Sequence, residues 1–184
     1  PNYAKAYSNL GNILIELGNL QDAKISLHKA IEIKPDFADA HLNLGEILRY
    51  LGNLKEAELY TRKAIEIKPD FADAHLNLGK ILRYLGKLKE ARLSLIKAIE
   101  IKPDLAKAYY SISLLKYSDE NKIWMDKLFD ESILSNKSPE DQVDIFFARA
   151  NICHKQKKYE DSSKYLKLGN KLKIHLHSSN SDLL

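Results

Sequence analysis

Residues 38–71 read ADAHLNLGEILRYLGNLKEAELYTRKAIEIKPDF, and residues 72–105 repeat them as ADAHLNLGKILRYLGKLKEARLSLIKAIEIKPDL. The two stretches differ at seven of 34 positions: Glu46/Lys80, Asn53/Lys87, Glu58/Arg92, Tyr60/Ser94, Thr61/Leu95, Arg62/Ile96 and Phe71/Leu105. Proline keeps the same period, at Pro1, Pro35, Pro69 and Pro103. A fixed period of this length indicates supersecondary units that each bury an apolar face against their neighbours.

Each unit carries the signals of two helices. Leucines at helical spacing predict a first helix over residues 38–51, and Gly52 ends it because glycine tolerates a left-handed turn. A second helix is expected over residues 54–67. Pro69 prevents its continuation, and Asp70 is expected to cap the helix that follows.

Small residues recur where the two helices of a unit must meet. Gly45, Ala57 and Ala64 return in the next unit as Gly79, Ala91 and Ala98. A bulkier side chain at these places is expected to overpack the contact between the helices.

This layout resembles the tetratricopeptide repeat, a helix–turn–helix family with Trp, Leu, Gly, Tyr, Ala, Phe, Ala and Pro at set places. Those places hold Tyr7, Leu10, Gly11, Leu14, Ala23, Leu27, Ala30 and Pro35; then His41, Leu44, Gly45, Leu48, Ala57, Thr61, Ala64 and Pro69; then His75, Leu78, Gly79, Leu82, Ala91, Leu95, Ala98 and Pro103. The resemblance implies an all-α, right-handed α-solenoid. Residues 1–105 then hold three regular repeats: repeat 1 (4–37), repeat 2 (38–71) and repeat 3 (72–105).

Beyond residue 105 the pattern weakens. Residues 106–176 are interpreted as two degenerate helical pairs, with these residues at the packing places: Tyr109, Ile112, Met125, Phe129, Phe146, Ala150, Cys153, Tyr159, Ser162 and Leu166. Ser138 followed by Pro139 and acidic residues predicts a helix start. Residues 177–184 are expected to form a polar, frayed tail or a linker.

The overall composition narrows the class of protein. Lys and Arg exceed Asp and Glu by 29 to 25, and the charge is evenly spread, which argues against a nucleic-acid partner. No apolar run suits a membrane span. A single cysteine fits a reducing compartment, so a cytoplasmic location is expected. The chain begins at Pro1 in phase with the repeat, which fits a fragment of a longer protein.

A stripe on the first helices is the candidate binding surface. In the tetratricopeptide family the first helices line a concave groove that receives peptides, and Asn9, Asn43 and Asn77 recur there. An amide can pair with both groups of a peptide unit. This asparagine ladder resembles the repeats of O-GlcNAc transferase. The other predicted peptide-binding residues are Asp39, Asp73, Glu46, Lys80, Arg49, Arg83, Tyr50 and Tyr84.

Two alternatives to a peptide-binding ladder stay open. The asparagines can instead bond across neighbouring helices, or they can be copies left by duplication. A carboxylate clamp of the co-chaperone type is not favoured, because the places before the ladder hold Ser8, Leu42 and Leu76 rather than basic residues.

The sequence shows no convincing active site, and no cofactor or metal is predicted. His41 and His75 occupy the family's Trp place and are expected to pack between helices. Cys153 falls at a packing place, so a dyad with His154 is not expected. His175 and His177 lack further ligands at metal-binding spacing.

We therefore predict a non-enzymatic protein-interaction module that binds an extended peptide or partner segment. The alternative is an accessory recognition arm of a larger bacterial transferase, because residues 118–173 look similar to the region preceding a sulfotransferase domain. A third class is a scaffold that self-associates through repeat ends, with Ile96 as an added apolar surface residue.

Overall fold

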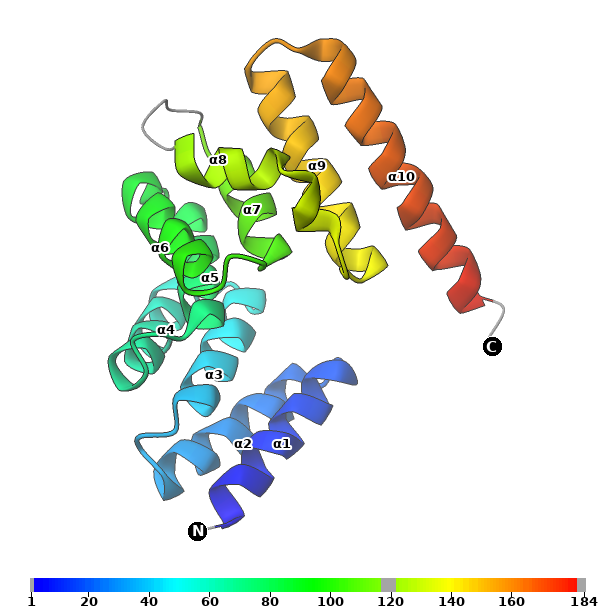
Figure 1. Cartoon of the computed structure of the whole chain (residues 1–184). Coiled ribbons are helices and arrows are strands. Elements are labelled where there is room, and N and C mark those ends of the chain that lie inside the picture. Colours follow the sequence, from blue (N-terminus) through cyan, green and yellow to red (C-terminus); the bar gives the residue numbers. More distant parts are fainter. Residues whose placement is uncertain (1, 117–121, 182–184) are drawn as a thin grey trace. The chain divides into compact units, whose positions relative to one another are not determined.

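The computed structural model describes residues 2–116 and 122–181, and all regular elements within them are helices (Figure 1). In chain order they are α1 (Asn2–Glu16), α2 (Leu20–Ile33), α3 (Ala38–Tyr50), α4 (Leu54–Ile67), α5 (Ala72–Tyr84), α6 (Leu88–Ile101), α7 (Ala106–Ser113), α8 (Lys122–Phe129), the 3-10 turn η1 (Glu131–Leu134), α9 (Pro139–Lys155) and α10 (Tyr159–Ser181). The predicted all-α repeat fold is confirmed.

The chain folds as two compact units, Pro1–Ile101 and Lys102–Leu184. In the N-terminal unit each first helix packs on its own second helix, and each second helix packs on the next first helix. The helix predicted over 54–67 is α4, and the one predicted over 38–51 is α3, which ends one residue earlier. Gly52 has φ of 81°, a left-handed backbone that makes the turn between them.

Glycine sets the distance between the two helices of a repeat. A Cβ added to Gly45 would collide with the Thr61 hydroxyl and lie 3.2 Å from the Ala57 carbonyl. A Cβ on Gly79 would lie 2.5 Å from Leu95 Cγ. The helices approach so closely that neither site has room for a side chain, as the sequence predicted.

In repeats 2 and 3, the histidine at the family's Trp place is hydrogen-bonded to the proline before the repeat. His41 Nε2 lies 2.8 Å from the Pro35 carbonyl oxygen, and His75 Nε2 lies 2.9 Å from that of Pro69. Because a carbonyl only accepts, Nε2 carries the proton in both histidines. His41 is buried as expected, His75 is half-buried, and both are hydrogen-bonded to the preceding loop.

The prediction that Asp70 caps α5 is wrong. The N-cap residue is Phe71, and it makes no side-chain cap hydrogen bond. The loop is instead held by backbone hydrogen bonds to Phe71 O and by the tie from His75 to Pro69.

A surface ion network joins repeats 2 and 3. Arg62 Nη2 lies 2.8 Å from Glu58 Oε1 and 2.9 Å from Glu90 Oε2, and Lys87 Nζ lies 2.9 Å from Glu58 Oε2. Burial pushes the pKa of Glu58 up, but the hydrogen bonds from Lys87 and Arg62 outweigh it and lower that pKa. Three members of this network, Glu58, Arg62 and Lys87, sit at positions where the two repeats differ.

The C-terminal unit departs from the repeat pattern at its first pair. Helix α7 packs mainly on α9, whereas the first helix of each regular repeat packs on the helix that follows it. The repeat places that hold Ala23 and Leu27 in repeat 1 hold the larger Met125 and Phe129 here.

A buried arginine fixes α8 and η1 to α9. The Arg149 side chain is 1% exposed and donates to the Leu128 carbonyl (2.9 Å), the Asp130 carbonyl (3.0 Å) and Glu131 Oε1 (3.0 Å). Its guanidinium also lies over the ring of Tyr165. One side chain thus satisfies two backbone carbonyls where α8 ends and η1 begins.

The last helical pair, α9 and α10, packs along its length. Ser138 Oγ accepts from the Asp141 backbone N–H at 3.2 Å, so the predicted helix start is confirmed. Cys153 is buried as expected, and burial raises the pKa of its thiol. Helix α10 runs to Ser181, into the predicted tail, while Asp182–Leu184 and Pro1 lie outside the described residues.

Replacing Gly45 with alanine tests the close helix contact. We expect Gly45→Ala to lower the free energy of unfolding by about 1–3 kcal/mol, because the new Cβ must displace Thr61. Urea unfolding measures the change. The exposed control Lys55→Ala is expected to stay within about 0.5 kcal/mol of wild type. Equal stabilities of the two variants would contradict the packing argument.

Tyr109 is expected to make the stability of the fold decrease with pH in the alkaline range. Its hydroxyl donates to the Pro103 carbonyl at 2.9 Å, and burial, followed by the Asp104 charge, raises its pKa to about 12. Because the fold favours neutral Tyr109, its contribution is complete below about pH 10, the ordinary tyrosine pKa, and is lost as the pH rises towards about 12.

We expect Tyr109→Phe to lose about 0.5–1.5 kcal/mol at neutral pH. Its stability is then expected to fall less steeply than that of wild type above about pH 10. Urea unfolding at several pH values measures both effects, with the exposed Tyr3→Phe as control. Parallel pH profiles of wild type and Tyr109→Phe would contradict the assignment.

Candidate functional site

A hollow of about 600 Å³ lies where the first helices of repeats 1 and 2 meet. Helix α1 contributes one wall, α3 the other, and the loop before α3 closes one side. The lining residues are Ala4, Lys5, Ser8, Asn9, Asn12, Lys34, Phe37, Asp39 and Asn43. Among the predicted site residues, the structure therefore brings Asn9, Asp39 and Asn43 together.

The hollow displays amide groups. Asn9 is exposed and has no hydrogen-bonding partner among the described residues. Asn43 is half-buried and donates from Nδ2 to Asn12 Oδ1 at 2.6 Å. In the free chain Asn43 therefore forms a hydrogen bond across neighbouring helices, which was one of the two alternatives. Asn9 keeps both its donor and its acceptor available for a ligand.

Asn77 is placed differently from the other two asparagines. It is 5% exposed, donates from Nδ2 to Thr61 Oγ1 at 3.2 Å, and accepts from Arg49 Nε at 3.3 Å. The residue corresponding to Thr61 in repeat 1 is Leu27, which offers Asn43 no hydroxyl. Asn77 is a structural contact between repeats in this state, and it does not line the hollow.

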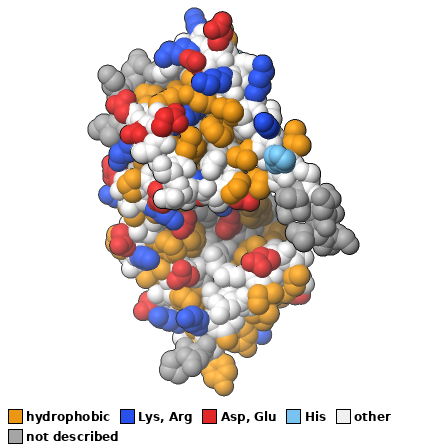
Figure 2. Space-filling view, turned by 45° about the vertical axis from the view of Figure 1, so that its right-hand side comes forward, with side chains coloured by type: hydrophobic (Ala, Val, Ile, Leu, Met, Phe, Trp, Pro, Cys, Tyr) orange, Lys and Arg blue, Asp and Glu red, His pale blue; other side chains and the backbone are white. Residues whose placement is uncertain are grey.

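The charged members of the predicted site are scattered along the stripe. Asp39 and Asp73 are exposed in the first turns of α3 and α5. Glu46 lies 3.6 Å from Arg49, whereas its counterpart in repeat 3 is Lys80, of opposite charge. On the face drawn in Figure 2, basic, acidic and hydrophobic side chains are interspersed.

Two arginine–tyrosine pairs lie at the C-terminal ends of α3 and α5, the first helices of repeats 2 and 3. The Arg49 guanidinium lies 4.2 Å from the Tyr50 ring centroid, and that of Arg83 lies 4.5 Å from the Tyr84 centroid. The tyrosines are 59% and 56% exposed. Each pair is an exposed, partly apolar surface, and Tyr and Arg are the residue types that most often anchor partners.

The predicted site did not include Lys34 and Phe37, the two lining residues of the hollow that lie outside the first helices. Both lie in the loop between α2 and α3, and the Lys34 ammonium lies 5.5 Å from the Phe37 ring centroid. The same pair recurs as Lys68 and Phe71, at 4.7 Å. The repeated motif KPDF at 34–37 and 68–71 was a usable signal, but it lies outside the first helices, where the binding stripe was predicted.

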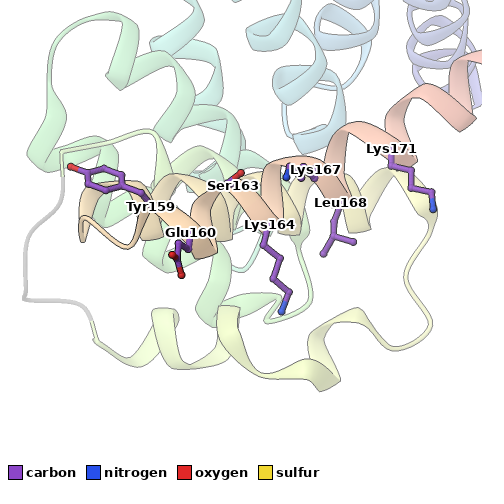
Figure 3. A pocket seen from close by; sticks show the side chains of 7 residues that line it. All are labelled: Tyr159, Glu160, Ser163, Lys164, Lys167, Leu168 and Lys171. Carbon is purple, nitrogen blue, oxygen red and sulfur yellow. The ribbon is translucent and has the colours of Figure 1, made fainter.

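A second hollow, of about 720 Å³, lies along the side of α10 (Figure 3). Its described lining residues all come from that one helix: Tyr159, Glu160, Ser163, Lys164, Lys167, Leu168 and Lys171. Figure 3 shows Lys164 and Leu168 projecting from the same side of the helix. With no opposing wall among the described residues, this surface offers less to a ligand than the hollow between α1 and α3.

Family models match a continuous part of the chain. Models described as "Tetratricopeptide repeat" match residues 38–71 and 60–93, and one described as "TPR repeat" matches residues 11–52 and 79–118. Together they span residues 11–118, more than half of the chain. The chain belongs to the tetratricopeptide repeat family. The similarity of its C-terminal part to a region preceding sulfotransferase domains stays a prediction.

Solved tetratricopeptide repeat structures share the fold. PilF of Pseudomonas aeruginosa matches with a TM-score of 0.70 and 23% identity, over 92% of this chain and 76% of that one. A Thermobaculum terrenum O-GlcNAc transferase matches at 0.62 and 22%, over 83% of this chain but only 26% of that one. The first TPR of Spaghetti (RPAP3), bound to the HSP90 peptide SRMEEVD, matches at 0.59 and 20%, over 60% and 88%.

A comparison with curated proteins returns no significant match. Within residues 2–116 and 122–181, no helix is both long and apolar enough to cross a membrane. Nor do the described residues gather three or more His, Cys, Asp or Glu side chains into a metal-binding group.

Alanine substitutions separate structural asparagines from available ones. We expect Asn77→Ala to cost about 1–3 kcal/mol, because it leaves Thr61 and Arg49 without their buried partner. Asn9→Ala is expected to stay within about 0.5 kcal/mol of wild type. Thermal and urea unfolding of both variants measure the difference. A stable Asn77→Ala would show that its contacts contribute little.

Proposed function

We propose that this chain is a protein-interaction module that holds an extended peptide along the first helices of repeats 1 and 2. The observation that carries the proposal is the hollow between α1 and α3, where Asn9 presents an unpaired amide beside the Asn12–Asn43 pair. The tetratricopeptide fold and a structural neighbour that binds a peptide support the general class.

The chemistry of the hollow favours main-chain recognition. The amides of Asn9, Asn12 and Asn43 can donate to peptide carbonyls and accept from peptide N–H groups. Lys5 and Lys34 add positive charge, and Asp39 adds one negative charge. The Phe37 ring gives an apolar contact beside them. Such a site tolerates many sequences, and it prefers segments with an acidic and an apolar side chain.

The size of the expected affinity is modest. A hydrogen bond contributes about 0.5–1.5 kcal/mol net, so a few amides give a weak complex. The Arg49–Tyr50 and Arg83–Tyr84 pairs supply the anchors that raise the affinity if the segment extends toward repeat 3.

Peptide selection followed by substitution tests the groove. A random peptide library displayed on phage is selected on the whole chain, and a labelled binder is titrated by fluorescence anisotropy. We expect the double variant Asn9→Ala and Asn43→Ala to bind about 5- to 100-fold more weakly, through the loss of two hydrogen-bonding amides. Thermal unfolding of each variant checks that its fold is retained.

Gln21 provides the matched control for the amide substitutions. It is an exposed amide on α2, away from the hollow, and Gln21→Ala is expected to leave affinity unchanged. Equal affinity of the double variant and wild type, with both folded, would contradict the proposed groove. Failure to select any binder would count against the peptide-binding module itself.

The second proposal is an accessory recognition arm of a larger transferase. The observation in its favour is that a similar fold forms part of a transferase chain, of which the match covers 26%. The groove would then hold the protein substrate or partner of that enzyme. Sequencing the gene on both sides of the region that encodes this chain tests it, and the absence of a transferase domain would overturn it.

A further inference from the structure

A third hollow, of about 450 Å³, lies where α4 of repeat 2 meets α5 and α6 of repeat 3. All three helices contribute to its lining, which includes Arg62, Ile65, His75, Leu78, Leu93 and Ser94. The described lining residues include none of the predicted peptide-binding residues. This hollow is therefore a different surface from the one between α1 and α3.

The preceding pair of repeats contains the same place in a filled form. Three of the lining residues have counterparts one period earlier: His28 for Arg62, His41 for His75 and Tyr60 for Ser94. The Tyr60 ring meets the His28 ring edge-on, with centroids 5.8 Å apart, and its centroid lies 5.9 Å from that of His41. Tyr60 also packs on the buried cluster that contains Leu44. A tyrosine of the chain itself thus occupies this place between repeats 1 and 2.

Ser94 and His75 show that the corresponding place in repeat 3 is open. Where repeat 2 has a tyrosine ring, repeat 3 has the short side chain of Ser94. His41, which lies beside the Tyr60 ring, is 5% exposed, whereas His75 is half-buried and lines the hollow. An added aromatic ring would therefore find a place of the kind that Tyr60 fills.

The lining of the hollow suits an aromatic side chain. Ile65 and Leu78 provide apolar contacts, and a guanidinium such as that of Arg62 pairs favourably with the face of an aromatic ring. Ion pairs with Glu58 and Glu90 hold Arg62 in position. The group that fills the equivalent place one repeat earlier is a side chain carried on a helix. The fitting occupant here is therefore an aromatic side chain carried by another polypeptide.

We propose that the hollow between α4, α5 and α6 receives a tyrosine or another aromatic side chain of a partner protein. Aromatic side chains are common anchors at interfaces because they bring a large contact area with few rotatable bonds. One ring supplies only part of a stable interface, so this contact is one anchor within a larger one. This inference does not rest on the proposed peptide groove.

An NMR titration of the whole chain with N-acetyl-tyrosinamide tests the hollow. We expect saturable shifts of the His75 ring and Leu78 methyl signals, with a dissociation constant in the millimolar range. Ser94→Tyr is expected to abolish these shifts, because the introduced ring takes the place of the probe. Gln21→Tyr adds the same ring at an exposed site on α2 and is expected to bind like wild type. No saturable shift in wild type, or equal binding by Ser94→Tyr, would overturn the proposal.

Urea unfolding gives a second measurement on the same variants. We expect Ser94→Tyr to unfold at a higher urea concentration than wild type, because the introduced ring fills the hollow as Tyr60 fills its counterpart. Gln21→Tyr is expected to unfold at the same concentration as wild type. A Ser94→Tyr chain that is less stable than wild type would show that the hollow does not fit a ring, and would contradict the proposal.

Two further probes separate the kinds of occupant. N-acetyl-leucinamide is expected to bind about 2- to 10-fold more weakly than the tyrosine amide, and equal affinity would overturn the aromatic preference. Phenol is expected to bind no more tightly than the tyrosine amide; tighter binding would indicate a small-molecule site and overturn the proposal of a partner side chain. The double variant Asn9→Ala and Asn43→Ala is expected to bind the tyrosine amide like wild type, which distinguishes failure here from failure of the peptide groove.

Discussion

Close contact between two helices at a glycine is the constraint on which the rest of this fold depends. At Gly45 and Gly79 the facing side chain, Thr61 or Leu95, occupies the space that a Cβ would need. Ala57 and Ala91 are fully buried at this contact, and each second helix also packs on the next first helix. In the C-terminal unit, where Met125 and Phe129 stand at the facing places, α7 packs mainly on α9 instead.

Most of the fold could be predicted from the sequence because it follows from residues that act locally. Gly52 ends a helix, Pro69 prevents continuation, and leucine spacing defines the buried face. The failure at Asp70 has a physical cause as well. A cap depends on the backbone geometry of the loop, and here the neighbouring His75 holds that loop through Pro69. The C-terminal unit was harder to predict, because Arg149 acts on a segment 18 to 21 residues before it.

The candidate site was predictable in outline only. The repeat pattern locates the first helices, and with them Asn9, Asp39 and Asn43. It cannot show that Asn77 is buried, since its partners Thr61 and Arg49 stand where repeat 1 has Leu27 and Ile15. Nor does it show that the loop residues Lys34 and Phe37 complete the hollow. Corresponding positions of the repeats have the same place in the backbone. The contacts of their side chains depend on which neighbouring residues differ between the repeats.

The contacts between repeats 2 and 3 have a consequence for how the chain finds its register. Nearly identical segments can stack out of register, with one repeat in the place of another, at little cost in free energy. The Glu58–Arg62–Lys87 network and the Thr61–Asn77 hydrogen bond depend largely on positions where the two repeats differ. A frame-shifted stack cannot form them. The differences between these duplicated segments therefore favour the native order of stacking, because they provide contacts that only the correct pair of neighbouring repeats can form.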